Sequence, residues 1–268
     1  MTAVDEWRRT LASWALPEEI LTRTRKSPWE FPWELFRRRA EAALDAPPTP
    51  SAARALEALP DGGSVLDVGA GPGAASLALA RRAGRIVAVD QSREALTIFE
   101  ELASAAGLDH GAVVGTWPDI AARAPIADVV VCNHVLYNVA DLEPFVRELA
   151  THARRRVVTE ITAEHPRAED NDLWKRLYGL DRPTRPTADD AEHALSEIGV
   201  APHREDWVVV RPPEPRDDLI GRLLVEFALE PEEQPRLVDA LGGGLREVEG
   251  GWIAAPQERR VVTLWWET

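Results

Sequence analysis

The segment VLDVGAGPGAA, residues 65–75, decides the fold of this chain. It begins as a short apolar run that carries one acid, Asp67, and it continues into a glycine-dense turn and an alanine-rich helical pattern. Glycines in such a turn let a ligand approach the bare backbone. A second apolar run, residues 86–89, ends on Asp90, where an acid can accept hydrogen bonds from the two hydroxyls of a ribose. Together the two runs predict an α/β domain that binds a nucleoside.

Apolar runs of four to seven residues, separated by helical patterns, extend from residue 51 to residue 162. Strands that are apolar on both sides favour a parallel sheet with helices over both faces, because both sides of each strand are then buried. We therefore expect residues 51–162 to form an α/β core that binds the nucleoside. The pattern predicts strands at 64–68, 85–90, 112–115, 126–132 and 154–161, and helices at 51–59, 73–82 and 92–106.

The segments on either side of this core follow a different pattern. Residues 1–50 carry helical patterns interrupted by prolines and predict a helical amino-terminal cap. Residues 163–268 are expected to hold lid or insertion segments together with the last two strands of the same domain. Thr187 followed by acids predicts a helix start, because a threonine caps the helix and acids favour the positive end of its dipole. Further patterns predict a strand at 207–210, a helical insertion at 215–241 and a last strand at 260–266.

Composition limits the classes of protein to consider. The chain has 268 residues, 45% of them hydrophobic, which is enough for one large domain with an appended lid. A formal charge of -14 predicts repulsion of polyanions, so we expect no nucleic-acid partner. Cys132 is the only cysteine, so neither an intramolecular disulfide nor a thiolate metal cage can form. No apolar run approaches the ~18 residues of a spanning helix, and we expect a cytoplasmic protein without membrane contact.

The glycine pattern alone leaves the nucleoside open, because Gly69, Gly71 and Ala74 also fit a dinucleotide-binding turn. Asp67 favours another ligand, since a carboxylate beside the turn would repel a pyrophosphate and attract an ammonium or sulfonium cation. On these residues the chain resembles the Rossmann-like (class I) S-adenosylmethionine-dependent methyltransferases, whose first motif reads much like residues 66–73. The resemblance implies a seven-stranded, mostly parallel sheet in which an antiparallel last strand inserts between the fifth and the sixth.

The resemblance also implies a set of cofactor-binding residues. Asp90 would hold the ribose hydroxyls with Gln91 beside the adenine, and the backbone carbonyl of Asn133 would meet the cofactor's ammonium. The turn itself would pass under the methionine part, with an acid near the amino group; the residues concerned are Asp67, Gly69, Ala70 and Gly71.

The position that reads adenine departs from the family pattern. The family usually has an acid after its third strand, whereas this chain has Thr116 there. Either the Thr116 hydroxyl substitutes, or Asp119 reaches back, or backbone groups do the reading. Trp117 either stacks on the adenine or plugs the core.

The end of the fourth strand, residues 131–138, supplies candidates for the reaction itself. His134 is either a general base, because an imidazole titrates near neutral pH, or a lining residue of the cofactor pocket. Tyr137 is expected in a wall of the substrate cavity. The prolines of enzymes that methylate base or glutamine amino groups are absent after Asn133, and the strand ends without an acid for magnesium. We expect metal-independent transfer to a small-molecule acceptor.

Several aromatic residues flank the core and predict a roof over a flat or apolar acceptor, although such residues more often glue a helical cap to its domain. They are Trp29, Phe31, Trp33, Phe36, Trp174 and Tyr178, and we take Trp33 and Trp174 as substrate candidates. The run Arg37–Arg39 is either a solvated helix face or a patch that steers an acidic substrate. Two rival functions remain: an NAD(P)- or flavin-dependent oxidoreductase, and a non-catalytic S-adenosylmethionine-binding protein.

Overall fold

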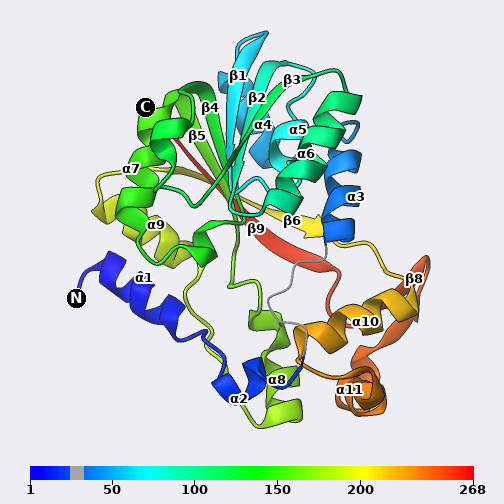
Figure 1. Ribbon diagram of the computed structural model, residues 1–268. Helices are drawn as coiled ribbons and strands as arrows, with labels where there is room; N and C mark the ends of the chain where they lie inside the picture. Colours follow the sequence, from blue (N-terminus) through cyan, green and yellow to red (C-terminus); the bar gives the residue numbers. More distant parts are fainter. Residues whose placement is uncertain (25–32) are drawn as a thin grey trace.

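A seven-stranded sheet forms the centre of the computed structural model, which describes residues 1–24 and 33–268 (Figure 1). The strand order is β3-β2-β1-β4-β5-β9-β6, and β1 to β5 are parallel to one another. Strand β9 runs antiparallel to both of its neighbours, β5 and β6. The predicted seven-stranded sheet with an antiparallel last strand is therefore confirmed. The strands are β1 (Gly63–Val68), β2 (Ala83–Asp90), β3 (Asp109–Val114), β4 (Ala127–Asn133), β5 (Ala153–Thr162), β6 (His203–Val210) and β9 (Glu258–Glu267).

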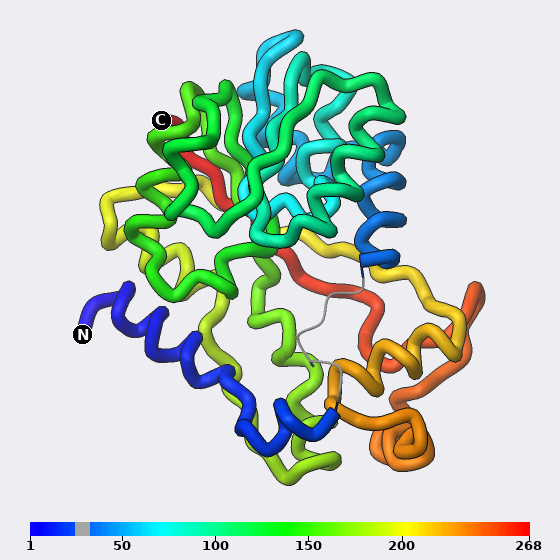
Figure 2. The backbone as a smooth tube through the Cα atoms, viewed as in Figure 1, coloured from blue at the N-terminus to red at the C-terminus, as the bar shows by residue number. Residues whose placement is uncertain are grey.

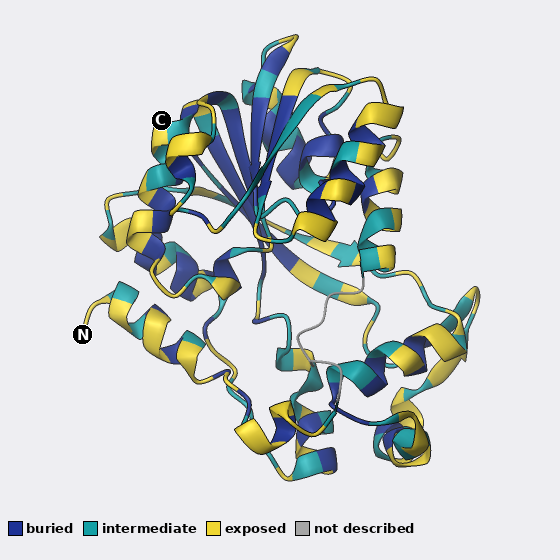
Figure 3. Ribbon diagram, in the orientation of Figure 1, coloured by how far each residue is buried: buried dark blue, intermediate teal, exposed yellow. Residues whose placement is uncertain are grey.

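Helices cover both faces of this sheet, as the apolar strands require, and each face has its own core. On one face the core joins the strands to α1 (Ala3–Ala12), α7 (Leu142–His152) and α9 (Ala188–Glu197). On the other face it joins them to α3 (Trp33–Ala43), α4 (Pro50–Ala58), α5 (Ala74–Leu77) and α6 (Arg93–Ala105). Figure 3 shows the central strands buried between helices that expose only their outer sides.

Helix α5 is much shorter than the 73–82 predicted from the sequence, and this prediction is wrong in its second half. After Leu77 the chain continues in successive tight turns, with hydrogen bonds from Leu79 to Ser76 and from Arg82 to Leu79. The physical reason is the start of β2, because Ala83 already pairs with Gly63 of β1. The chain must therefore reverse direction within residues 78–82, which an alanine-rich pattern does not reveal.

A lid with its own hydrophobic core lies on the side of the sheet toward which β1 to β5 run (Figure 1). Segments far apart in the sequence build it, as the colours in Figure 2 show. They are α2 (Glu18–Leu21), α8 (Asn171–Tyr178), α10 (Arg216–Glu226), α11 (Gln234–Leu241), β7 (Arg246–Val248) and β8 (Gly251–Ile253). The β7–β8 hairpin was not predicted. Arg182 lies over the rings of both Trp14 and Trp174, with its guanidinium carbon 5.3 and 5.7 Å from the ring centres, and thus ties the lid to the end of α1.

Short 3₁₀ helices occur at Ala121–Arg123, Leu136–Asn138, Ala168–Asp170, Pro231–Glu233 and Gly242–Gly244. Within residues 1–24 and 33–268, no helix has the length and apolar character needed to cross a membrane.

The glycine turn after β1 is shaped by close packing at two positions. At Gly69 (φ +71°) a Cβ atom would lie 2.3 Å from a methyl carbon of Val135, and at Gly73 (φ +89°) it would lie 2.4 Å from the ring of Phe99. Both positions also have left-handed backbone, which side chains other than glycine adopt at a cost. Gly71 has left-handed backbone as well, but no atom lies within 4 Å of its Cβ position.

We expect Gly73→Ala to lower the free energy of unfolding by about 2–4 kcal/mol, because backbone strain and the collision with Phe99 add together. Gly71→Ala is the matched control, since it has the strain without the collision, and it should cost about 1–2 kcal/mol. Urea unfolding of the ligand-free proteins measures both values. Equal losses in the two variants would contradict the packing role of Gly73.

Candidate cofactor-binding and reaction site

Asp67, the acid in the first motif, lies buried beneath the glycine turn. One of its carboxylate oxygens accepts hydrogen bonds from the hydroxyl of Ser76 at 2.6 Å and from the Ser76 backbone N–H at 3.2 Å. The second bond supplies an acceptor to the first turn of α5, whose cap residue Gly73 has no side chain to do so. The carboxylate therefore holds the turn and the helix together.

Burial raises the pKa of Asp67 to about 7, although the two hydrogen bonds from Ser76 act in the opposite direction. Nearby Asp90 adds to the increase. A positive charge held above the turn would favour the ionised form of this carboxyl group.

Asp90 joins the first two strand ends. One carboxylate oxygen accepts from the backbone N–H of Gly71 at 2.8 Å, and the other accepts from the N–H of Ser92 at 2.8 Å. Gln91 next to it is exposed, and Ala70 in the turn is partly buried. Asp90, which the sequence predicts to bind the ribose, thus lies against the glycine turn, and the exposed Gln91 follows it.

Two features test whether the site fits the cofactor implied by the first motif. The space above Gly71 is open at the position of a Cβ atom. The side-chain oxygen of Asn133, at the end of β4, is buried and has no hydrogen-bond partner among the described residues. Because buried acceptors are normally satisfied, this oxygen is suited to a donor such as an ammonium group. The described residues fit a nucleoside with a cationic tail.

The end of β3 divides into exposed and buried residues. Thr116 and Asp119 are both exposed. Trp117 is buried, donates from its indole nitrogen to the backbone carbonyl of Phe145 at 3.2 Å, and meets the ring of His152 edge-on at 4.9 Å between ring centres. These contacts place the indole in the core beside α7.

His134 occupies the loop that follows β4 and pairs with an acid that the sequence analysis did not single out. Its Nε2 atom lies 2.8 Å from an oxygen of Glu160 on β5, and its backbone N–H donates to the Glu160 carbonyl at 2.7 Å. The imidazole side chain is 54% exposed, whereas that of Glu160 is only 10% exposed. His134 also has left-handed backbone, with φ at +60°. A buried acid therefore orients an accessible imidazole at the carboxyl edge of the sheet.

Burial by itself would raise the pKa of Glu160, but its hydrogen bond and ion pair with His134 and a hydrogen bond from Ser51 hold this pKa below the usual value. Glu160 is thus ionised near neutral pH and accepts from the imidazole Nε2–H. The other ring nitrogen, Nδ1, is then the basic one. The sequence does offer a signal, because Glu160 is the single acid in the apolar run of β5, on the strand next to β4.

The candidate substrate residues lie in packed surroundings. Tyr137 is buried, stacks on Trp7 with ring centres 5.7 Å apart, and donates to the carbonyl of Thr162 at 2.8 Å. Burial raises its pKa far above the ordinary value. Trp174 is buried in the lid core, with its ring centre 5.0 Å from that of Phe227.

The aromatic residues of the amino-terminal segment are only partly described. Trp33 lies on α3, packs against the core of that face, and has its ring centre 6.0 Å from that of Phe36. Trp29 and Phe31 lie outside the described residues. Tyr178 belongs to the lid, where its hydroxyl donates to the carbonyl of Phe227 at 2.6 Å.

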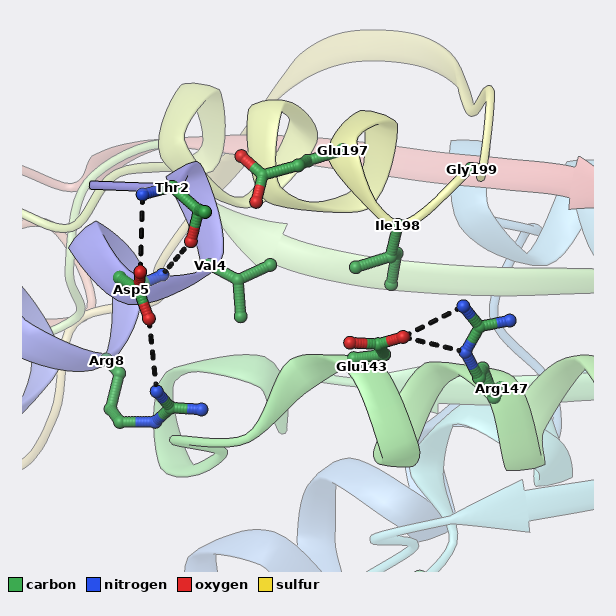
Figure 4. A pocket seen from close by; sticks show the side chains of 9 residues that line it. All are labelled: Thr2, Val4, Asp5, Arg8, Glu143, Arg147, Glu197, Ile198 and Gly199. Atoms are coloured by element: carbon green, nitrogen blue, oxygen red, sulfur yellow. Dashed lines mark hydrogen bonds and ion pairs between the residues drawn. The ribbon is translucent and has the colours of Figure 1, made fainter.

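A recess of about 490 Å³ lies between the start of α1, α7 and the end of α9 (Figure 4). Its charged side chains pair with one another, since Arg147 meets Glu143 at 2.8 Å and Arg8 meets Asp5 at 3.4 Å. The recess belongs to the helical layer and not to the carboxyl edge of the strands, and we assign it no role. Within the described part of the chain, no group of three or more His, Cys, Asp or Glu residues is placed to hold a metal ion.

Known proteins resemble this chain in sequence and in fold. Residues 66–158 match the sequence model of a family described as a methyltransferase domain. An uncharacterised protein of Haemophilus influenzae is 32% identical over 104 residues, which amount to 38% of this chain and 38% of that protein. The match thus spans well under half of this curated relative.

Solved structures share the fold at low sequence identity. The YcgJ protein of Bacillus subtilis has a TM-score of 0.54 and 17% identity, covering 80% of this chain and 96% of its own. A cyclopropane-fatty-acyl-phospholipid synthase-like protein of Lactobacillus casei has a TM-score of 0.51 and 18% identity, covering 86% and 92%. Coclaurine N-methyltransferase, solved with N-methylheliamine and S-adenosylhomocysteine, has a TM-score of 0.53 and 15% identity, covering 99% and 86%.

The fold and the first motif define a Rossmann-like nucleoside-binding enzyme domain of the methyltransferase type. Residues 66–158 carry a methyltransferase domain, and the sheet has the topology of the class I S-adenosylmethionine-dependent methyltransferases that the segment at 66–73 resembles. The strand order and the antiparallel β9 are those that the resemblance implied, so the oxidoreductase alternative is set aside.

The raised pKa of Asp67 gives a pH-dependent prediction. Because the folded protein holds this proton more tightly than the unfolded chain, ionisation of Asp67 lowers stability progressively as pH rises from about 4 to about 7. Asp67→Asn keeps an oxygen acceptor for Ser76 and removes the titration. We expect the stability of this variant relative to the wild type to rise over that range and then level off, as measured by urea unfolding at about pH 4.5, 6 and 8.

Asp128→Asn serves as the control for this measurement. In the wild type, a hydrogen bond from the Ser64 backbone N–H lowers the pKa of Asp128. Its carboxylate is therefore already ionised in the folded state throughout the same range. Its relative stability should not rise between pH 4.5 and 8. A pH-independent difference for Asp67→Asn would show that Asp67 ionises normally.

Proposed function

We propose that this protein is a cytoplasmic S-adenosylmethionine-dependent methyltransferase that acts on a small-molecule acceptor by metal-independent, in-line methyl transfer. The observation that carries the proposal is the His134–Glu160 pair at the carboxyl edge of the sheet, beside the turn bridged by Asp90 and Gly71. It combines an accessible base with a nucleoside-binding turn at neighbouring strand ends.

The cofactor supplies an activated methyl group when it is bound. Gly69, Ala70 and Gly71 would lie under its methionine part, and Asp90 would exchange its hydrogen bond to the Gly71 N–H for the ribose hydroxyls. The buried, unpartnered side-chain oxygen of Asn133 supports a contact with the ammonium at the end of β4. Gln91 and Thr116, both exposed, are the residues we assign to the adenine side.

Asp67 supports the site from beneath the glycine turn. Its hydrogen bonds to Ser76 hold the glycine turn in place, so its carboxylate acts on the cofactor through the turn and its charge. The contacts of Trp117 with Phe145 and His152 favour core packing over stacking on adenine.

His134 would remove a proton from the acceptor. Since Nε2 donates to Glu160, the free Nδ1 would take the proton that the acceptor loses on methylation. Glu160 then stabilises the imidazolium that results. The left-handed backbone of His134 supports this role, because strained conformations of non-glycine residues concentrate at functional sites.

A small acceptor is supported by the lid and by charge. The lid lies over the carboxyl edge of the sheet, and the net charge of -14 opposes a nucleic acid. Tyr137, Trp33 and Trp174 remain candidates for the walls of the acceptor site, although their described contacts are with other protein groups.

Asp90→Ala tests the ribose contact. We expect it to weaken the binding of S-adenosylhomocysteine by about 1–3 kcal/mol, the value of a lost charged hydrogen-bond pair, as measured by calorimetry. Asp109→Ala, which removes an exposed partner of Arg85 on β3, should leave the affinity unchanged. In the wild type, S-adenosylhomocysteine should raise the melting temperature and NAD(P) should not. Stabilisation by NAD(P) alone would overturn the proposal.

The His134–Glu160 pair is tested with an acceptor found by screening small molecules with labelled cofactor. His134→Asn keeps a residue that tolerates left-handed backbone but cannot take the proton, so kcat should fall about 10²-fold or more with little change in KM. Glu160→Gln should lower kcat about tenfold or more.

Glu164→Gln, at an exposed acid just beyond β5, is the control and should keep full turnover, as should the wild type in the presence of a chelator. Unchanged kcat in His134→Asn would remove His134 from the reaction. Tight binding of S-adenosylhomocysteine without transfer to any acceptor would instead identify a non-catalytic binding protein.

A further inference from the structure

Four arginines from four different elements converge on one corner between the sheet and the lid. They come from α3, the end of β6, α10 and the start of β9, which border the same region in Figure 1. Arg39 of α3 is within electrostatic reach of the other three, which are Arg211, Arg222 and Arg259.

Three of these arginines already have carboxylate partners. Arg222 pairs with Glu214 at 2.8 Å and with Glu226 at 2.9 Å. Arg211 pairs with Glu169 at 2.7 Å, and Arg259 meets the same carboxylate at 3.2 Å. One acid therefore serves two guanidinium groups.

Arg39 has no such partner among the residues that the structure describes. The guanidinium carbon of Arg39 lies 5.6 Å from the ring centre of Phe36. Desolvation lowers the pKa of Arg39, and the positive charges of Arg222, Arg259 and Arg211 lower it further, against only Glu214 on the other side. Arg39 is nevertheless an exposed residue.

The other charged groups at the corner do not balance the positive charge of these arginines. Arg167 also pairs with Glu226, so this carboxylate is shared as well. Asp170 has a pKa raised to about 7 by burial and by the neighbouring Glu226 and Glu169, so it is only partly ionised at neutral pH. Besides Asp170, the corner thus holds five guanidinium groups against three glutamates: Arg39, Arg167, Arg211, Arg222 and Arg259 against Glu169, Glu214 and Glu226.

The corner lies on the same side of the sheet as the reaction site. Glu160 is directly opposite Thr263 in the β5–β9 pairing, and opposite residues of antiparallel strands point to the same face. Arg259 is four residues before Thr263 on β9, so it faces the same side about 14 Å away, at the 3.4 Å rise per residue of a strand.

We infer that the acceptor carries an anionic group, a carboxylate or a phosphate, that binds at Arg39 and Arg259 while its nucleophile lies at His134. The position of the nucleophile at His134 rests on the proposed function, whereas the anion site at Arg39 and Arg259 does not. An oxyanion accepts bidentate hydrogen bonds from guanidinium groups and relieves the repulsion among them. The separation along β9 selects an acceptor whose anionic group is roughly 10–14 Å from the methylated atom.

Of the run Arg37–Arg39, only one residue takes part. Arg37 pairs with Glu101 of α6, and Arg38 pairs with Glu34 at the solvent surface at 3.4 Å. Arg38 is therefore a matched control, because it is adjacent, equally charged and outside the corner.

The test is calorimetric titration of the full-length protein with three probes: benzoate, phenyl phosphate and the neutral benzamide. We expect at least one of the two anions to bind the wild type about tenfold or more tightly than benzamide, and Arg39→Gln to weaken that binding about tenfold or more. Arg38→Gln should bind like the wild type. The anion that binds more tightly identifies the group as carboxylate or phosphate.

Equal binding of anions and benzamide, or unchanged anion binding in Arg39→Gln, would overturn the inference. An equal loss in Arg38→Gln would also overturn it, because general surface charge would then explain the binding. Separate titrations with S-adenosylhomocysteine distinguish this result from a failure of the proposed function. If the wild type binds S-adenosylhomocysteine but neither anion, the anion site alone is rejected. If the wild type binds an anion but not S-adenosylhomocysteine, the methyltransferase proposal alone is rejected.

Discussion

The buried hydrogen bonds between Asp67 and Ser76 are the interaction on which the site depends. They hold a short helix directly under the glycine turn, although the chain has only residues 74–77 for that helix before it must turn back into β2. The backbone N–H of Gly71, in the glycine turn, donates a hydrogen bond to Asp90 at the end of the neighbouring strand. Without the Asp67 carboxylate, the Ser76 N–H at the start of the helix would lose its acceptor.

The antiparallel insertion of β9 is the second constraint. It places a strand that arrives from the lid directly beside β5, so that Glu160 and Arg259 share one face of the sheet. The same strand therefore connects the reaction edge to the arginine-lined corner under the lid. Because the lid has its own hydrophobic core, it is a distinct packing unit that meets the sheet through charged and aromatic groups.

The sequence predicted what depends on local order. Apolar runs gave the strands of the core, and the threonine cap at Thr187 predicted the start of α9, where a reciprocal capping box is found. It failed where distant residues decide the outcome. Helix α5 ends early because Ala83 pairs with Gly63, and Glu160 becomes a partner of His134 only through the pairing of β4 with β5. The sequence around a tryptophan such as Trp117 does not show whether its side chain packs in the core or lines a pocket.

The sequence by itself determined the class of this protein, because the glycine turn, the acids at 67 and 90 and the alternation of apolar runs act over short stretches of chain. Only the tertiary structure decided where the side chains of those segments point. Asp67 accepts hydrogen bonds from Ser76 because a buried carboxylate needs donors. Arg39 has different neighbours from Arg37 and Arg38 because successive helix residues face different directions. Such choices arise from packing between segments far apart in the chain, which no local pattern records.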